Sequence, residues 1–184
     1  MQDDTDTQGD PVAQTRRWLQ RAVIGLNLCP FARAVHVRNQ VRYVLSDATT
    51  PTDLLGDLTR ELEFLHAADP EMVETTLLIH PRVLGDFLDY NDFLDDADAA
   101  LEALGLEGEI QVASFHPGYM FAGSDPDDPA NCTNRSPYPM LHLLREDSVS
   151  RAVDAFPDPD AIVERNIETL ERLGIEGYDR LLRD

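Results

Sequence analysis

The sequence predicts a single-domain protein of the α/β or α+β class, with a small sheet of about three strands or slightly more, covered by about five to six helices. Three observations lead to this prediction. The chain has 184 residues and 42% hydrophobic composition, which suits one domain with its own core. Short β-favouring runs alternate with longer amphipathic stretches. No internal repeat and no linker divides the chain.

The beginning of the chain is predicted to be a disordered acidic tail at residues 1–10, followed by one globular domain at 11–184. Apolar residues at helical spacing predict a helix from about 11 to 28, and Pro11 suits its first turn. A second, short helix should cover roughly residues 30–35, because proline favours the first position of a helix.

Three β-favouring runs predict the strands, at residues 41–45, 75–79 and 109–115. The run at 75–79 is almost entirely apolar, which is typical of a buried central strand. Four further amphipathic segments predict helices, at about 50–66, 84–104, 148–155 and 160–173. The first of these begins with Thr50 as its N-cap, and the last ends at Gly174.

The charge of the chain limits its partners. The formal net charge is -20, and every basic residue is arginine because lysine is absent. Such a surface repels phosphate backbones, so we expect no nucleic-acid binding. No apolar run approaches the roughly 18 residues needed to cross a membrane, and the acidic start lacks the features of a secretory signal. We therefore expect a cytoplasmic protein that binds no membrane, and no feature predicts its oligomeric state.

Cys29 lies between two predicted helices, because the residue before Pro30 disfavours helix. A thiol beside a helix N-terminus is stabilised as the reactive thiolate, and Arg33, one turn on, would add to this effect. The alternative is an inert cysteine in a helix–helix corner. A thioredoxin-type dithiol is not expected, because Ala32 stands where the second cysteine would be.

Two predicted strands end in the same dipeptide, His-Pro, at His80 and at His116. In α/β sheets, ligands bind outside the carboxyl ends of the strands. If these two strands are parallel neighbours, the two histidines share one crevice. Each histidine taken alone is equally well explained as a polar group that is satisfied at a strand end.

The stretch 114–146 concentrates aromatic and polar residues, and a helix is predicted to start at Ser136. A helix N-terminus beside an arginine favours an anion. On that helix His142 and Glu146 would share a face. Arg135 has the alternative role of tying coil to backbone carbonyls. The residues expected to hold a small anionic ligand are Arg33, Tyr119, Asn131, Asn134, Arg135, Ser136, Tyr138, His142 and Arg145.

These residues favour an enzyme acting on a small anionic metabolite, with Cys29 as nucleophile and His116 or His80 as base. A metal-dependent enzyme is an alternative. In it His80 and His116, with His142, Cys29 or Glu146, would bind zinc or iron, although no compact ligand pair is present. The third reading is a non-catalytic module that binds a ligand or a protein.

Several long motifs are shared with a known family. They are the segments 26–32, 77–81, 87–94, 111–117, 134–139 and 141–146. Through them the chain resembles DUF1415, a family of uncharacterised bacterial proteins, over about residues 12–178. The resemblance implies a single cytoplasmic domain of about this size and brings no activity or cofactor. Met120 and Cys132 depart from the expected pattern, which makes Cys132 an unlikely catalytic group, whereas Cys29 matches it.

Overall fold

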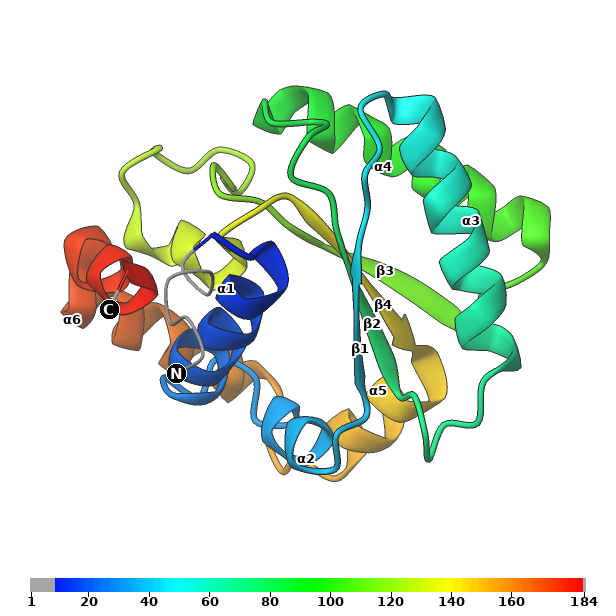
Figure 1. The fold of residues 1–184 in the computed structure, drawn as a ribbon. Coiled ribbons are helices and arrows are strands. Elements are labelled where there is room, and N and C mark those ends of the chain that lie inside the picture. Colours follow the sequence, from blue (N-terminus) through cyan, green and yellow to red (C-terminus); the bar gives the residue numbers. More distant parts are fainter. Residues whose placement is uncertain (1–8, 184) are drawn as a thin grey trace, which may run out of the picture.

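Four strands form one mixed sheet in the order β1-β2-β4-β3 in the computed structural model, which describes residues 9–183 (Figure 1). The strands are β1 (Val41–Leu45), β2 (Thr75–Ile79), β3 (Ile110–Phe115) and β4 (Met140–Arg145). β1 is parallel to β2, whereas β4 is antiparallel to both β2 and β3. β2 and β3 therefore point in the same direction, one on each side of β4.

The helices confirm the predicted α+β class. They are α1 (Pro11–Trp18), the π-helical η1 (Leu19–Ile24), α2 (Ala32–Val37), α3 (Pro51–Ala67), α4 (Phe87–Leu104), the 3-10 helix η2 (Pro129–Asn134), α5 (Glu146–Asp154) and α6 (Asp160–Arg183). Within the described residues, no helix is long and apolar enough to cross a membrane.

Short polar side chains define three of the helix starts. Thr50 accepts a hydrogen bond from the backbone of Asp53 and caps α3, as predicted. Asp86 caps α4, and Asp10 caps α1 by accepting from Val12 N. The predicted tail covers residues 1–10, of which 1–8 lie outside the described part of the chain.

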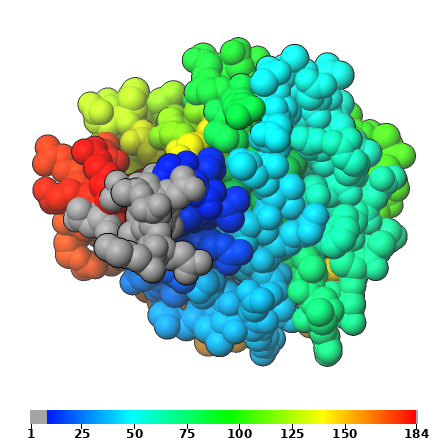
Figure 2. Space-filling view, in the orientation of Figure 1, coloured from blue at the N-terminus to red at the C-terminus, as the bar shows by residue number. Residues whose placement is uncertain are grey.

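The helices cover both faces of the sheet, and the sheet divides the core in two (Figure 1). On one face α3 and α4 pack against side chains such as Leu78 and Leu141. On the other face α1, η1 and α6 pack against side chains such as Leu77 and Met140. The alternation follows from the two-residue period of a strand. The space-filling view shows the β1 region at the surface, between the dark blue of α1 and the cyan of α3 (Figure 2).

The strand β4 corrects one prediction. The segment after Ser136 was predicted to be helical, with Ser136 as an N-cap. Instead the Ser136 hydroxyl donates to Tyr138 O at 2.7 Å, and the chain then enters β4. Pro139 explains the difference, because it disfavours helix at Tyr138. The apolar run that follows pairs with strands on both sides. Because it lies between β2 and β3, those two strands are not neighbours.

Candidate functional site

His80 and His116 lie at the same end of the sheet, where β2 and β3 terminate, although β4 separates these two strands. Ile79 of β2 and Phe115 of β3 both pair with Met140, from opposite sides. Each histidine is the next residue after one of these partners, so both emerge beside the beginning of β4. Both are buried.

Tyr90 of α4 joins the two histidines. Its ring stacks on His80 at a centroid distance of 5.8 Å and lies 5.0 Å from the ring of His116. Its hydroxyl donates to Met140 O at 2.8 Å and accepts from Phe115 N at 3.0 Å. Burial raises the pKa of Tyr90, so its hydroxyl keeps the proton that it donates. One side chain thus fixes α4 to the ends of β3 and β4.

Both imidazoles donate to the loop between β2 and α4. His80 Nδ1 donates to Val83 O at 3.1 Å, and His116 Nε2 donates to Leu84 O at 3.0 Å. His116 Nδ1 accepts from Gly118 N at 2.9 Å, so this ring is the neutral Nε2–H tautomer. Leu84 has a φ of 58°, in the left-handed region that costs a residue with a side chain energy. The two histidines therefore hold a strained turn in place.

One buried nitrogen of this cluster has no hydrogen-bond partner. His80 is 0% exposed, and its Nε2 is unpaired within the described residues. Leaving a buried polar atom unpaired costs about 1–3 kcal/mol. Because Nδ1 holds the ring proton, Nε2 presents a lone pair. Burial lowers the pKa of His80 to about 4, the nearby His116 adds to that shift, and burial also lowers the pKa of His116. Both rings are neutral at pH 7.

A row of aromatic rings connects this buried cluster to the surface. Phe87 lies 6.4 Å from Tyr90 and 5.2 Å from Tyr119, measured between ring centroids. Tyr119 lies 5.1 Å from Phe121, which is 39% exposed. Of the predicted ligand-binding residues, Tyr119 is therefore joined to the histidines through Phe87.

Arg135 has the structural role that was its alternative in the prediction. Its Nε donates to Tyr119 O at 3.1 Å and its Nη2 to Pro126 O at 2.8 Å. Its own carbonyl accepts from Trp18 Nε1 at 3.1 Å and from Tyr178 Oη at 2.6 Å. The arginine thus ties the long loop to itself and to α1 and α6.

The amides of the same loop are also engaged with the protein. Asn131 is buried, its oxygen accepts from Ser124 Oγ at 2.8 Å, and its nitrogen donates to a backbone carbonyl. Asn134 Nδ2 donates to Ser114 O at 3.0 Å. Ser136 and Tyr138 bond to each other, as described above. These contacts shape the loop, and they leave the predicted anion site without a free set of donors.

Cys29 and Arg33 lie elsewhere in the fold. Cys29 O accepts from Ala32 N at 3.3 Å at the start of α2, and α2 lies where β1 begins (Figure 1). Arg33 is exposed on α2. Within residues 9–183, no hydrogen bond joins the Cys29 thiol to His80 or His116. The predicted Cys–His pair is therefore not formed.

His142, Arg145 and Glu146 are also away from the cluster, because the segment is a strand. His142 pairs with Leu77 and faces the α1 side of the sheet, where its Nε2 donates to Thr75 Oγ1 at 2.7 Å. Burial lowers the pKa of His142 to about 4. Arg145 donates to three backbone carbonyls near the end of α3. Glu146 begins α5 at the opposite end of β4 from the two histidines.

The five candidate metal ligands consequently do not form one set. Within residues 9–183, no group of three or more His, Cys, Asp or Glu side chains is arranged to hold a metal ion. His80 and His116 both contact Tyr90, but each uses a nitrogen to hold the loop. Neither His142 nor Glu146 reaches them.

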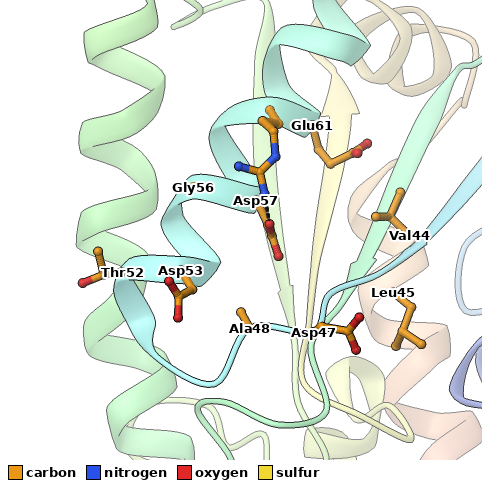
Figure 3. Close-up of a pocket in the computed structure, with 10 residues that line it drawn as sticks. Val44, Leu45, Asp47, Ala48, Thr52, Asp53, Gly56, Asp57 and Glu61 are labelled. Atoms are coloured by element: carbon orange, nitrogen blue, oxygen red, sulfur yellow. Dashed lines mark hydrogen bonds and ion pairs between the residues drawn. The ribbon is translucent and has the colours of Figure 1, made fainter.

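An open hollow of about 650 Å³ lies at the carboxyl end of β1, against the first turns of α3 (Figure 3). None of the predicted site residues lines it. Its lining consists of Val44, Leu45, Asp47, Ala48, Thr52, Asp53, Gly56, Asp57, Arg60 and Glu61.

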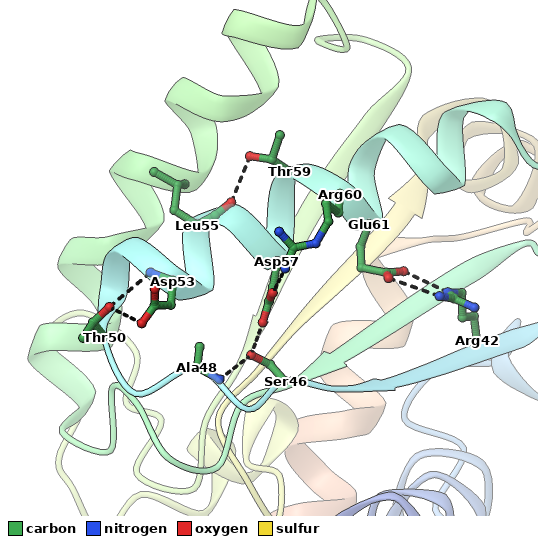
Figure 4. A network of polar contacts seen from close by, with 10 residues as sticks. All are labelled: Arg42, Ser46, Ala48, Thr50, Asp53, Leu55, Asp57, Thr59, Arg60 and Glu61. Carbon is green, nitrogen blue, oxygen red and sulfur yellow. Dashed lines mark hydrogen bonds and ion pairs between the residues drawn. The ribbon is translucent and has the colours of Figure 1, made fainter.

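The carboxylates of this hollow are tied into a polar network (Figure 4). Asp57 accepts from Ser46 Oγ and from Arg60. Glu61 accepts two hydrogen bonds from Arg42, at 2.8 and 3.1 Å. These contacts hold α3 against β1 and fix the carboxylates that line the hollow.

Comparison with known proteins adds a family and no activity. The family model "Protein of unknown function (DUF1415)" matches residues 10–180, nearly the whole chain. The chain belongs to this family. No curated protein and no solved structure matched it.

In this DUF1415 protein, sequence reasoning missed the residue that organises the site. Tyr90 follows Asp89 in an acidic segment that reads as a solvated helix face, so nothing in the local pattern signals burial. Leu84 was placed at the start of a helix, but with its left-handed φ it lies inside the loop before α4, which begins at Phe87. The one available signal was the family motif 87–94, which contains Tyr90.

Proposed function

We propose that this protein is an enzyme acting on a small anionic molecule, bound where the loop 81–86 meets the ends of β2 and β3. The unpaired Nε2 of His80 carries the proposal. Within residues 9–183, it is the one nitrogen of the two-histidine cluster that no protein group uses. A native fold keeps such a group unpaired at a cost in stability, and a ligand that donates to it removes that cost.

The chemistry that suits His80 is acceptance of a proton or a hydrogen bond. A pKa of about 4 gives the neutral ring roughly the basicity of an ordinary aspartate, but without a charge. Such a group has its lone pair free throughout the neutral range. Removal from water also strengthens its hydrogen bond to a donor. We therefore assign His80 the role of base, in place of the Cys29–His pair.

The anionic part of the ligand is assigned to Arg82, two residues after His80. Its Nη1 lies 3.6 Å from Asp47 Oδ1, and the two side chains are 65% and 85% exposed. An ion pair that exposed contributes little, so an anionic ligand can replace the aspartate. Entry requires the loop 81–86 to move, and the strained Leu84 lowers the cost of that movement. The two free thiols suit a reducing compartment, and we propose the cytoplasm.

The proposal is tested with two substitutions that separate the nitrogens of His80. The amide nitrogen of His80→Asn occupies about the position of Nδ1, so it keeps the bond to Val83 O and removes the Nε2 acceptor. The amide of His80→Gln reaches the Nε2 position instead and gives up the loop contact. His66→Gln, at an exposed histidine on α3, is the matched control.

The measurement is ¹⁵N NMR of labelled histidine during titration with a panel of small carboxylates and phosphate esters. We expect a ligand that shifts the Nε2 signal of His80, binds His80→Asn at least about tenfold more weakly, and binds the His66 variant normally. Turnover of that ligand identifies the reaction. If no compound shifts the signal, or if His80→Asn binds equally well, His80 is not the ligand-binding group. Binding without turnover would make the protein a binding module.

A further inference from the structure

Within residues 9–183, one edge of the sheet has no strand beside it. β1 is the terminal strand, and it bonds to β2 through alternate residues. Ser46 N donates to Ile79 O at 2.8 Å, and Gln40 O accepts from Glu74 N at 3.0 Å. The even-numbered residues of this strand therefore bond to β2. The odd-numbered residues Val41, Tyr43 and Leu45 direct their backbone amides and carbonyls away from the sheet. No hydrogen bond within residues 9–183 reaches these groups.

This edge is reachable from solvent, and exposed apolar side chains and two arginines, Arg16 and Arg42, flank it. Figure 2 shows the β1 region on the facing surface. Leu45 at its end is 42% exposed, and Phe64 of α3 is 41% exposed. The guanidinium of Arg42 lies over the Phe64 ring, 4.1 Å from its centroid. An open strand edge flanked by exposed apolar side chains favours pairing with another extended chain.

The acidic hollow continues this edge. Val44 and Leu45 of β1 form part of its wall (Figure 3). Four lining residues carry carboxylates, and three of these form ion pairs with arginines: Asp47 with Arg82, Asp57 with Arg60 and Glu61 with Arg42. The fourth, Asp53, accepts from Thr50 Oγ1 and forms no ion pair within residues 9–183. A chain lying along β1 thus reaches a site at its end that favours a positive side chain.

The net charge decides between two occupants of this edge. A second copy of the chain would bring together two molecules of formal charge -20 each. Like charge of that size opposes association, whereas it attracts a cationic partner and raises its rate of binding. Within the hollow, the unpaired carboxylate of Asp53 adds the same preference locally.

We propose that the free edge of β1 docks an extended basic segment of another protein. The segment adds a strand outside β1 and bonds to Val41, Tyr43 and Leu45 through its backbone. One of its lysine or arginine side chains enters the hollow beside Asp53. The site contains neither His80 nor Arg82, although Asp47 in its wall pairs with Arg82, and separate experiments test the two proposals.

The probe is a fluorescein-labelled peptide of alternating valine and arginine, used with two matched peptides. One carries N-methyl groups on alternate backbone amides, which keep the charge and abolish strand pairing. The other carries glutamate in place of arginine. On the protein side, Leu45→Lys places a positive charge at the edge, and Val163→Lys makes the same change in charge on α6, at a side chain 61% exposed. Fluorescence anisotropy measures each affinity.

We expect the first peptide to bind, and N-methylation, glutamate and Leu45→Lys each to weaken binding at least about tenfold. Val163→Lys should leave the affinity within about twofold. Equal binding of the N-methylated peptide would show an electrostatic contact without strand pairing and would overturn the proposal. So would the absence of binding, or equal losses in both lysine variants. Sedimentation of the protein alone tests the other occupant, because a dimer that Leu45→Lys dissociates would assign the edge to a second copy.

Discussion

His80 and His116 donate through opposite ring nitrogens to consecutive carbonyls of one loop. Nδ1 of the first bonds to Val83 O, and Nε2 of the second bonds to Leu84 O. The two strand ends are thereby joined through the turn that leads into α4. This arrangement makes the His-Pro dipeptides a structural clamp, and only the Nε2 of His80 is left over for a ligand.

The clamp predicts opposite tautomers for the two rings. In histidine-labelled protein at pH 7, ¹⁵N NMR should show the proton of His80 on Nδ1 and that of His116 on Nε2, because each nitrogen faces a carbonyl. His142 should also carry its proton on Nε2, since that nitrogen donates to Thr75 Oγ1, whose own proton bonds to Leu143 O. Finding His80 in the Nε2–H form would contradict the assignment of the free lone pair.

The buried histidines predict that stability falls on mild acidification. The unfolded chain protonates histidine near pH 6.5, whereas His80 and His142 have folded pKa values of about 4. The unfolded state binds more protons between these values, so stability is complete above pH 6.5 and falls as the pH decreases toward 4. Between pH 6.5 and 5, where most carboxylates are still ionised, each histidine should cost roughly 2 kcal/mol.

Urea unfolding at a series of pH values measures this dependence. His80→Asn and His142→Gln should each flatten the curve, since neither replacement can be protonated. The control is His66→Gln, at a histidine that is 53% exposed. An unfolding free energy that is constant from pH 6.5 to 5 would contradict the prediction.

Tyr90→Phe should destabilise the fold by about 1–3 kcal/mol, because it removes both hydrogen bonds of a buried hydroxyl. These bonds join Tyr90 to Met140 O and to Phe115 N. Tyr138→Phe is the matched control, since the Tyr138 hydroxyl has no hydrogen-bond partner within residues 9–183. The urea midpoint reports both changes. Equal losses would mean that the bridge from α4 to the strands contributes nothing.

The sequence predicts the ends of β1 and β2 well, but it does not predict β4, the strand that lies between β2 and β3. β1 and β2 begin and end where the β-favouring runs predicted, because each is a short apolar run bounded by polar residues. β4 was missed because Ser136-Pro137 is typical of a helix start. Six mostly apolar residues fit a central strand and a buried helix equally. Only pairing with β2 and β3, far away in the chain, decides between them.

The candidate site divides in the same way. His80 and His116 were predicted to share a crevice if their strands were parallel neighbours. The strands point the same way, which brings both histidines to one end of the sheet, but β4 lies between them. Cys29 could not be placed, because its position relative to that end of the sheet depends on how α1 and α2 pack on the sheet. Arg135 shows a further limit: an arginine in a polar loop has the same local pattern whether it binds an anion or backbone carbonyls.

The two cysteines should differ in reactivity. Cys132 is 1% exposed and burial raises its pKa, whereas Cys29 is partly exposed. Iodoacetamide should therefore modify Cys29 alone in the native protein and both thiols in urea, as measured by mass spectrometry of peptides. Modification of Cys29 should leave the ¹⁵N signals of His80 unchanged. A shift of those signals would restore the Cys29–His80 pairing that the contacts do not show.

Arg145→Met should destabilise the protein by about 2–4 kcal/mol, because Nη2 of Arg145 serves three backbone carbonyls in one place. The distances are 2.8 Å to Leu65 O, 2.9 Å to Ala68 O and 3.0 Å to Val73 O. These groups belong to the end of α3 and the turn into β2, which methionine would leave without a donor. Arg145→Lys should recover part of the loss, since an ammonium also offers three donors. Arg33→Met, at an exposed arginine on α2, is the control, and urea unfolding compares the three variants. A loss for Arg145→Met no larger than for Arg33→Met would show that these contacts do not support the end of α3.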